Sequence, residues 1–173
     1  SKTKNFIFKG KQSFSSSKLD QIKVQFCKSN ELDTKIFSNE IYLVLSESEQ
    51  IDQHELKDIL SAKENDTDFS FYVGPRLGTI SPWSSKTEDI IRNVGFKNIL
   101  RVERLYGFKI ESDFEIDKLD LSMFYDRMTQ SIYFNYDDFA DLFKTEKAKS
   151  LNKINILDKG KSELEQANKL YGF

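Results

Sequence analysis

The sequence contains few of the residues on which disulfides, metal centres and most nucleophilic sites depend. Among its 173 residues there is one cysteine, Cys27, and one histidine, His54. A single cysteine excludes an intramolecular disulfide, and we expect Cys27 to be a small buried apolar side chain. His54 lies at the start of a polar-faced helix, where a surface histidine is the simplest interpretation. Metal-ligand clusters and phosphate-binding glycine motifs do not occur, so we predict no catalytic, cofactor-binding or metal-binding residue in this chain.

The sequence also lacks an excess of either charge and any long apolar run. Its 26 basic and 28 acidic residues give a formal net charge of -2, and they include no long block of lysine or arginine. A nucleic-acid-binding protein would need a clustered basic face, so we expect no nucleic-acid partner. Because there is neither a long apolar stretch nor a signal-peptide pattern, we expect no membrane association and a cytoplasmic location.

Glycine and proline are scarce, and several of them gather in residues 74–90 (GPRLGTISPWSSKTEDI). This segment holds both prolines, Pro75 and Pro82, the only tryptophan, Trp83, and two of the seven glycines. Proline fixes one backbone dihedral angle and restricts the residue before it, whereas glycine permits conformations closed to other residues. We therefore predict a rigid, shaped loop here.

This loop is expected to lead from a strand at 69–73 into a helix at 85–94. Either Ser84 or Ser85 can cap the start of that helix, and Ser85 has Glu88 three positions on, the spacing of a capping box. Segments of this strand–loop–helix kind commonly present side chains and backbone N–H groups to a partner.

Apolar periodicity predicts the same order of elements, strand–helix–strand–helix, in each half of the chain. The predicted strands are 5–8, 35–45, 69–73, 99–111 and 131–135, and the predicted helices follow Ser15–Ser17 and Asp52 and cover 85–94 and 118–130. Leu121, Phe124 and Met128 form the apolar stripe of the last helix, and Gly107 indicates a bulge or bend in its strand. The predicted fold class is α+β, with two related β/α halves, 1–65 and 66–145, whose antiparallel sheets pack around a shared core.

Residues 74–90 resemble the N-terminal region of large-type phosphoribosylformylglycinamidine synthase (FGAM synthase), an amidotransferase of purine biosynthesis. The family pattern PR-x-GT-x-SPWSSKATDI is similar to PRLGTISPWSSKTEDI in this chain. The matching residues are Pro75, Arg76, Gly78, Thr79, Ser81, Pro82, Trp83, Ser84, Ser85, Lys86, Asp89 and Ile90. Three further blocks are similar, in the same order: RVERLYGFKIE, YDRMTQSIY and ILDKGKSELEQANKLYGF. Glu88 and Leu105 depart from the pattern, which usually has alanine and glycine there.

The resemblance implies a PurS-like fold, similar to a fused pair of the small PurS-type subunits found where the enzyme is split. It implies an architectural role, in which the domain bridges the synthase and glutaminase domains and supports ammonia transfer. The whole enzyme converts formylglycinamide ribonucleotide, glutamine and ATP into formylglycinamidine ribonucleotide, and its ATP, Mg²⁺ and glutamine sites lie in other domains. We therefore expect this chain to be an excised, inactive piece whose partners are the synthase, linker and glutaminase domains. Residues 146–173 would be a connector and the start of the linker domain.

Six residues of the loop and the helix start are candidates for contact with those domains: Arg76, Thr79, Ser81, Trp83, Ser84 and Lys86. Arg76 and Lys86 carry charges that pair well with carboxylates or phosphate across an interface. Trp83 either fills the core of its own domain or anchors a neighbouring one, because aromatic side chains serve both purposes.

Two other functions compete with the architectural one. A free-standing ferredoxin-like regulatory module would bind a small effector, such as a purine or an amino acid, without any partner domain. A stand-alone hydrolase would use Ser81, Ser84 or Ser85 as its nucleophile. These serines lack the G-x-S-x-G context of a nucleophile elbow, and capping or turn formation explains them better.

Overall fold

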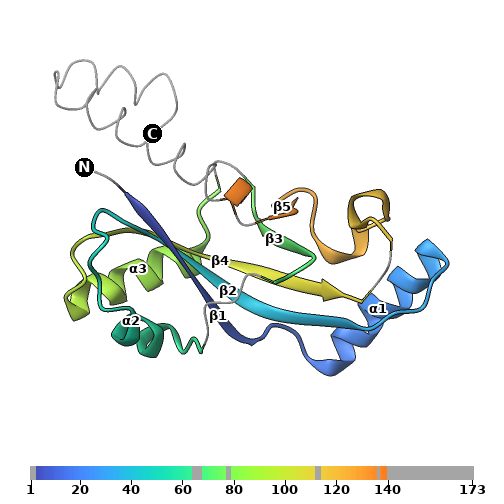
Figure 1. Ribbon diagram of the computed structural model, residues 1–173, viewed down its shortest axis with the longest axis horizontal. Coiled ribbons are helices and arrows are strands. Elements are labelled where there is room, and N and C mark those ends of the chain that lie inside the picture. Colours follow the sequence, from blue (N-terminus) through green and yellow to red (C-terminus); the bar gives the residue numbers. More distant parts are fainter. Residues whose placement is uncertain (1–2, 64–67, 77–78, 112–113, 136, 140–173) are drawn as a thin grey trace, which may run out of the picture.

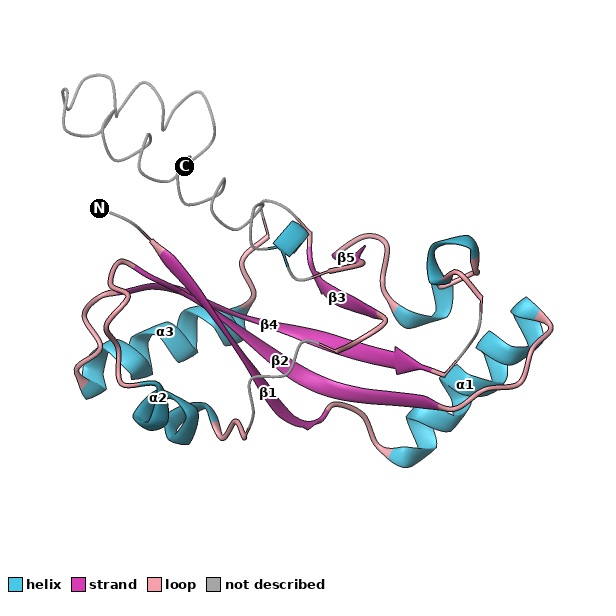
Figure 2. Ribbon diagram, viewed as in Figure 1, coloured by secondary structure: helices cyan, strands magenta, loops and turns pink. Residues whose placement is uncertain are grey.

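The fold is built on one open antiparallel sheet, which Figure 2 shows together with its helices. The computed structural model describes residues 3–139, apart from 64–67, 77–78, 112–113 and 136. Within these residues the order of elements is β1 (Lys4–Gln12), α1 (Ser16–Asn30), β2 (Ile36–Ser46), α2 (Gln53–Leu60), β3 (Phe71–Pro75), α3 (Pro82–Val94), β4 (Ile99–Ile110), the 3₁₀ helices η1 (Ile116–Lys118) and η2 (Ser122–Phe124), and β5 (Gln130–Tyr133). The α+β class predicted from the sequence is confirmed.

The strands of both halves join in a single sheet rather than in two. Their order is β1-β2-β4-β3-β5, and every neighbouring pair is antiparallel. The central ladder between β2 and β4 runs from Ile36 opposite Ile110 to Ser46 opposite Ile99. Because this ladder connects the first half of the chain to the second, the two halves share their backbone hydrogen bonds as well as their core.

One face of the sheet carries two apolar clusters, each covered by helices. The first contains Phe6, Phe8, Tyr42, Val44, Leu56, Leu60, Ile91, Ile99 and Val102, so α2 and α3 cover it. The second contains Ile22, Phe26, Ile36, Phe71, Val73, Phe108, Ile110, Leu121 and Phe124, so α1 and η2 cover it. Figure 1 shows α2 and α3 near one end of the sheet and α1 near the other.

The opposite face of the sheet is apolar as well. Its cluster contains Ile41, Leu43, Leu45, Tyr72, Leu105, Tyr133 and Phe139. Strand β2 is therefore buried on both faces, which explains its continuous apolar run from residue 41 to residue 45.

The helix starts predicted for the first half are confirmed. The Ser15 side chain caps α1 by accepting from the Lys18 N–H, and the Asp52 side chain caps α2 by accepting from the Glu55 N–H. Leu56 and Leu60 of α2 are buried as its apolar stripe predicts.

The helix predicted at 118–130 is wrong, because short polar side chains compete for its backbone. The Asp120 carboxylate accepts from the Ser122 N–H at 3.1 Å, and the Asp126 carboxylate accepts from the Met128 N–H at 2.9 Å. Such local bonds favour turns over helix. The segment consequently forms η1, η2 and a turn, in which Phe124 is buried as predicted but Met128 is exposed.

Of the bulge or bend predicted at Gly107, the bulge is wrong. Gly107 stays in register, opposite Asn39 on one side and Tyr72 on the other. A Cβ atom added there would lie 2.8 Å from ring carbons of Phe69 and 3.1 Å from Ile41. Glycine is needed here because Phe69 packs directly against the strand backbone. Besides bulges, such close approach is a common reason for glycine in a strand.

Three remaining expectations concern single features of the chain. Cys27 is half-buried against the second apolar cluster, next to α1's buried residues. The predicted connector, residues 146–173, lies outside the described residues. Among the described helices, none is long and apolar enough to cross a membrane.

Candidate functional site

Helix α3 begins earlier than the sequence pattern predicts. Its N-cap is Ser81, whose side chain accepts from the Ser84 N–H at 3.1 Å, and Pro82 occupies the first turn. Proline is favoured there because its missing N–H would have no intrahelical partner. The capping box predicted for Ser85 and Glu88 is therefore wrong, and Trp83 belongs to the helix rather than to a loop.

The cap is fastened to β4 by a buried polar network. The Ser81 hydroxyl donates to the Glu103 carboxylate at 2.8 Å, and the Arg101 guanidinium bonds that carboxylate at 3.4 Å. Arg101 also donates to the Thr79 carbonyl at 3.3 Å, while the Ser84 hydroxyl donates to the Val102 carbonyl. Glu103 is fully buried and Arg101 nearly so. Residues 79–84 are thus held by three consecutive residues of β4, 101–103.

Trp83 packs inside its own domain. Its ring stacks on Tyr42 with the centroids 5.5 Å apart and an interplanar angle of 11°. The Arg104 guanidinium lies 5.1 Å from the indole centroid, and Arg104 pairs with Glu40 at 3.6 Å. The Tyr42 hydroxyl donates to Glu40 at 2.6 Å, which closes this group of side chains. The structure therefore places Trp83 against β2 and β4, with its side chain half-buried.

Arg76 connects β3 to a turn that is distant in the sequence. Its guanidinium donates to the Arg127 carbonyl at 2.9 Å, and its backbone N–H donates to the Thr129 carbonyl at 3.1 Å. The Tyr133 hydroxyl adds a bond of 3.0 Å to the Pro75 carbonyl. Three sequence blocks, 74–90, 101–111 and 125–133, therefore meet at one end of β3.

The six predicted contact residues divide by exposure. Arg76, Thr79 and Lys86 are exposed, Ser81 and Trp83 are half-buried, and Ser84 is fully buried. Two exposed apolar residues of the same segment were not among the candidates: Ile80 and Ile90. Ile90 lies at the end of the matching string, so that string contained the signal that would have found it.

The structure brings no histidine to the serines of α3. The His54 side chain is 90% exposed on α2 and lies 3.8 Å from Asp58. Ser84 is buried and donates to the β4 backbone, and Ser81 donates to Glu103. The hydroxyls of Ser81 and Ser84 therefore make structural hydrogen bonds within the domain. In the described residues, no group of three or more His, Cys, Asp or Glu side chains is arranged to hold a metal ion.

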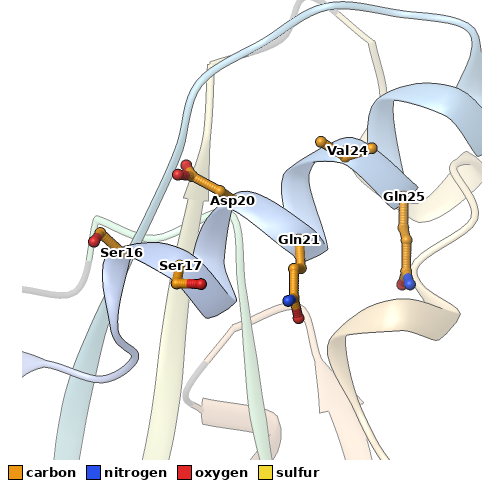
Figure 3. A pocket seen from close by; sticks show the side chains of 6 residues that line it. All are labelled: Ser16, Ser17, Asp20, Gln21, Val24 and Gln25. Atoms are coloured by element: carbon orange, nitrogen blue, oxygen red, sulfur yellow. The ribbon is translucent and has the colours of Figure 1, made fainter.

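Two hollows of the described surface lie away from α3. One, of about 660 Å³, is lined by residues of α1 alone, and Figure 3 shows Gln21 and Gln25 pointing to one side of that helix. These two glutamines also line a hollow of about 470 Å³ between α1, Tyr106 and residues 123–130. Its volume falls in the range of small-molecule pockets, but its lining contains no convergent set of catalytic groups.

The side-chain carboxyl of Glu88, on α3, has a shifted pKa. Burial raises its pKa above the ordinary 4.5, although the Val102 N–H, Arg92 and Ser84 act in the opposite direction. A carboxyl whose folded pKa is raised binds its proton more tightly in the folded state. Its contribution to stability is therefore complete below about pH 4.5 and is lost as the pH rises through the folded pKa.

We expect Glu88→Gln to flatten the pH dependence of stability above pH 4.5 and to leave the free energy of unfolding at pH 7 equal or higher. Glutamine keeps an oxygen for the Val102 N–H and has no proton to lose. Urea unfolding between pH 4 and 8 measures the slope, with Glu49→Gln, an exposed position, as the control. An unchanged slope in Glu88→Gln would contradict this account of its pKa.

The comparison with protein families gives one match. The model of the formylglycinamide ribonucleotide amidotransferase N-terminal family matches residues 38–143. The match begins in β2 and includes α2, β3, α3, β4 and β5, so it contains every residue of the network described above. It also extends the sequence likeness to the first half, where only the order of elements had supported it.

Proposed function

The chain belongs to the formylglycinamide ribonucleotide amidotransferase N-terminal family, and from this membership we propose that it is the architectural domain of FGAM synthase. Membership itself implies a role in that enzyme and in purine biosynthesis, together with other domains of the same enzyme. We propose further that the domain performs no chemistry and bridges the synthase and glutaminase domains, so that ammonia can pass between them. ATP, Mg²⁺ and glutamine would then bind to those other domains.

One observation carries this proposal: the α3 docking surface, which consists of Arg76, Thr79, Ile80, Lys86 and Ile90. All five side chains are exposed, and they flank a segment whose backbone is fixed by Ser81, Arg101 and Glu103. A surface ordered before binding loses less conformational entropy when a partner docks. It also combines apolar side chains with an arginine, a residue type that is enriched at protein interfaces.

We expect the double variant Lys86→Glu/Ile90→Asp to lower glutamine-dependent synthesis in the full-length enzyme by at least about tenfold. Activity supplied with free ammonium should fall much less, because that reaction bypasses transfer between domains. Both side chains are exposed, so the unfolding midpoint of the 173-residue chain should change little.

Val24→Asp is the matched control, because Val24 is an exposed apolar residue on α1, away from α3. An equal loss in the control, or no loss in the double variant, would rule out the α3 docking surface. Equal losses with glutamine and with ammonium would contradict the part of the proposal that concerns ammonia transfer.

A further inference from the structure

The turn at residues 125–130, here called the Asp126 turn, is built around one residue. The Asp126 carbonyl accepts from the Thr129 N–H at 3.2 Å and from the Gln130 N–H at 2.7 Å. The Asp126 carboxylate accepts from the Met128 N–H at 2.9 Å, and the Asp126 N–H donates to the Gln130 side chain at 2.9 Å. Four hydrogen bonds therefore fix a six-residue segment.

The Asp126 turn is also fastened to the sheet. Gln130 pairs with Pro75 in the ladder between β5 and β3. Arg76 bonds the Arg127 and Thr129 carbonyls, as described above. The turn cannot move independently of β3, and the position of its tip is set by the same strand end from which the α3 docking surface begins.

Met128 stands on this fixed turn with its side chain 86% exposed. No other exposed large apolar side chain among the described residues is so open; Val24, the next, is 65% exposed. Singly exposed apolar residues are common on protein surfaces; this one differs in that four hydrogen bonds hold its turn. Methionine adapts its shape to an apolar pocket, and a fixed backbone reduces the entropy lost when the pocket closes on it.

Cationic residues adjoin this methionine. Arg127 precedes it in the turn and is exposed, and Arg76 contacts the turn from β3. The turn also carries the Asp126 carboxylate, which accepts from the Met128 N–H at 2.9 Å, so two guanidinium groups stand against one carboxylate. An apolar tip beside guanidinium groups is complementary to an apolar pocket with carboxylates at its rim.

We propose that Met128 is an interdomain anchor, whose side chain inserts into an apolar pocket with a carboxylate rim on another domain of the enzyme. The inference rests on the proposed architectural function and adds to it a second contact, distinct from the α3 docking surface. The part of the contact that Met128 itself makes depends on the apolar character of its side chain, whereas Arg127 and Arg76 supply the charges beside it.

Photocrosslinking in the full-length enzyme tests the anchor. With p-benzoylphenylalanine in place of Met128, irradiation should link this position to a peptide from outside the 173-residue chain that contains apolar residues and Asp or Glu. The same probe at Val24 is the control and should give at least about tenfold less of this product, because Val24 lies on α1. A position 128 probe that links only within the 173-residue chain, or no better than the control, overturns the anchor.

A third probe position separates the two proposals. Crosslinks from Ile90 without crosslinks from Met128 would leave the α3 docking surface standing and remove the anchor. If neither position reaches another domain, both proposals fail.

Substitutions give a second readout that needs no probe. Met128→Leu keeps the apolar character and should keep the cleavage rate between the domains in limited proteolysis within about twofold. Met128→Glu should raise that rate roughly tenfold, because a carboxylate would enter an apolar pocket with like charges at its rim. Equal rates for the two variants would contradict the anchor.

Discussion

Replacing Glu103 with alanine should destabilise the domain by about 3–5 kcal/mol. Glu103 is fully buried, and its carboxylate receives the Ser81 hydroxyl at 2.8 Å and lies 3.4 Å from the Arg101 guanidinium. Alanine would remove the carboxylate that the buried Arg101 guanidinium contacts, and the α3 cap would lose the bond from Ser81 to β4. Urea unfolding of the 173-residue chain measures the loss.

The control for this prediction is an ion pair with better geometry and no burial. Lys118 and Glu115 lie 2.8 Å apart, closer than Arg101 and Glu103, but both side chains are largely exposed. Exposed pairs contribute little because water screens them, so Glu115→Ala should cost less than about 1 kcal/mol. If the two variants lost equal stability, burial would not be what makes Glu103 important.

Replacing Trp83 with alanine should cost about 2–3 kcal/mol of stability in the 173-residue chain, less than a fully buried tryptophan because the ring is half-buried. The substitution removes the stack on Tyr42 and the contact with Arg104. Trp83→Phe keeps an aromatic ring over Tyr42 and should lose about 1 kcal/mol.

The Trp83 prediction decides between the two functions left open for this side chain. If Trp83 only anchors a neighbouring domain, replacing it with alanine should not lower the stability of the isolated chain. A stability loss in Trp83→Ala smaller than that in Trp83→Phe would therefore favour the anchor. The stack on Tyr42 leads us to expect the opposite.

The sequence predicted the elements whose signals are local and consistent. The starts of α1 and α2 follow from Ser15 and Asp52, which act within their own turns. The helix predicted at 118–130 failed because Leu121, Phe124 and Met128 repeat as in a helix while Asp120 and Asp126 bond the backbone of turns. Periodicity does not register that competition, since it counts apolar residues alone.

Composition singled out the candidate segment at residues 74–90, but it did not predict how that segment is held in the fold. The restricted segment with both prolines and Trp83 does lie at the end of β3 and the start of α3. That Glu103 and Arg101 hold this segment could not be predicted, because both residues lie about twenty positions further along the chain. Burial of a charged pair depends on tertiary packing, which a single strand pattern does not contain.

Helices α1 and α3 each pack against core residues from the other half of the chain, which determines whether either half can fold alone. α1 belongs to the first half of the chain, yet Ile22 and Phe26 share a cluster with Phe71 and Val73 of the second. Likewise Ile91 of α3 shares a cluster with Phe6 and Phe8. A cut between the halves would therefore give two pieces that each present the other's missing core, so they must recombine to fold, as the subunits of an obligate dimer do.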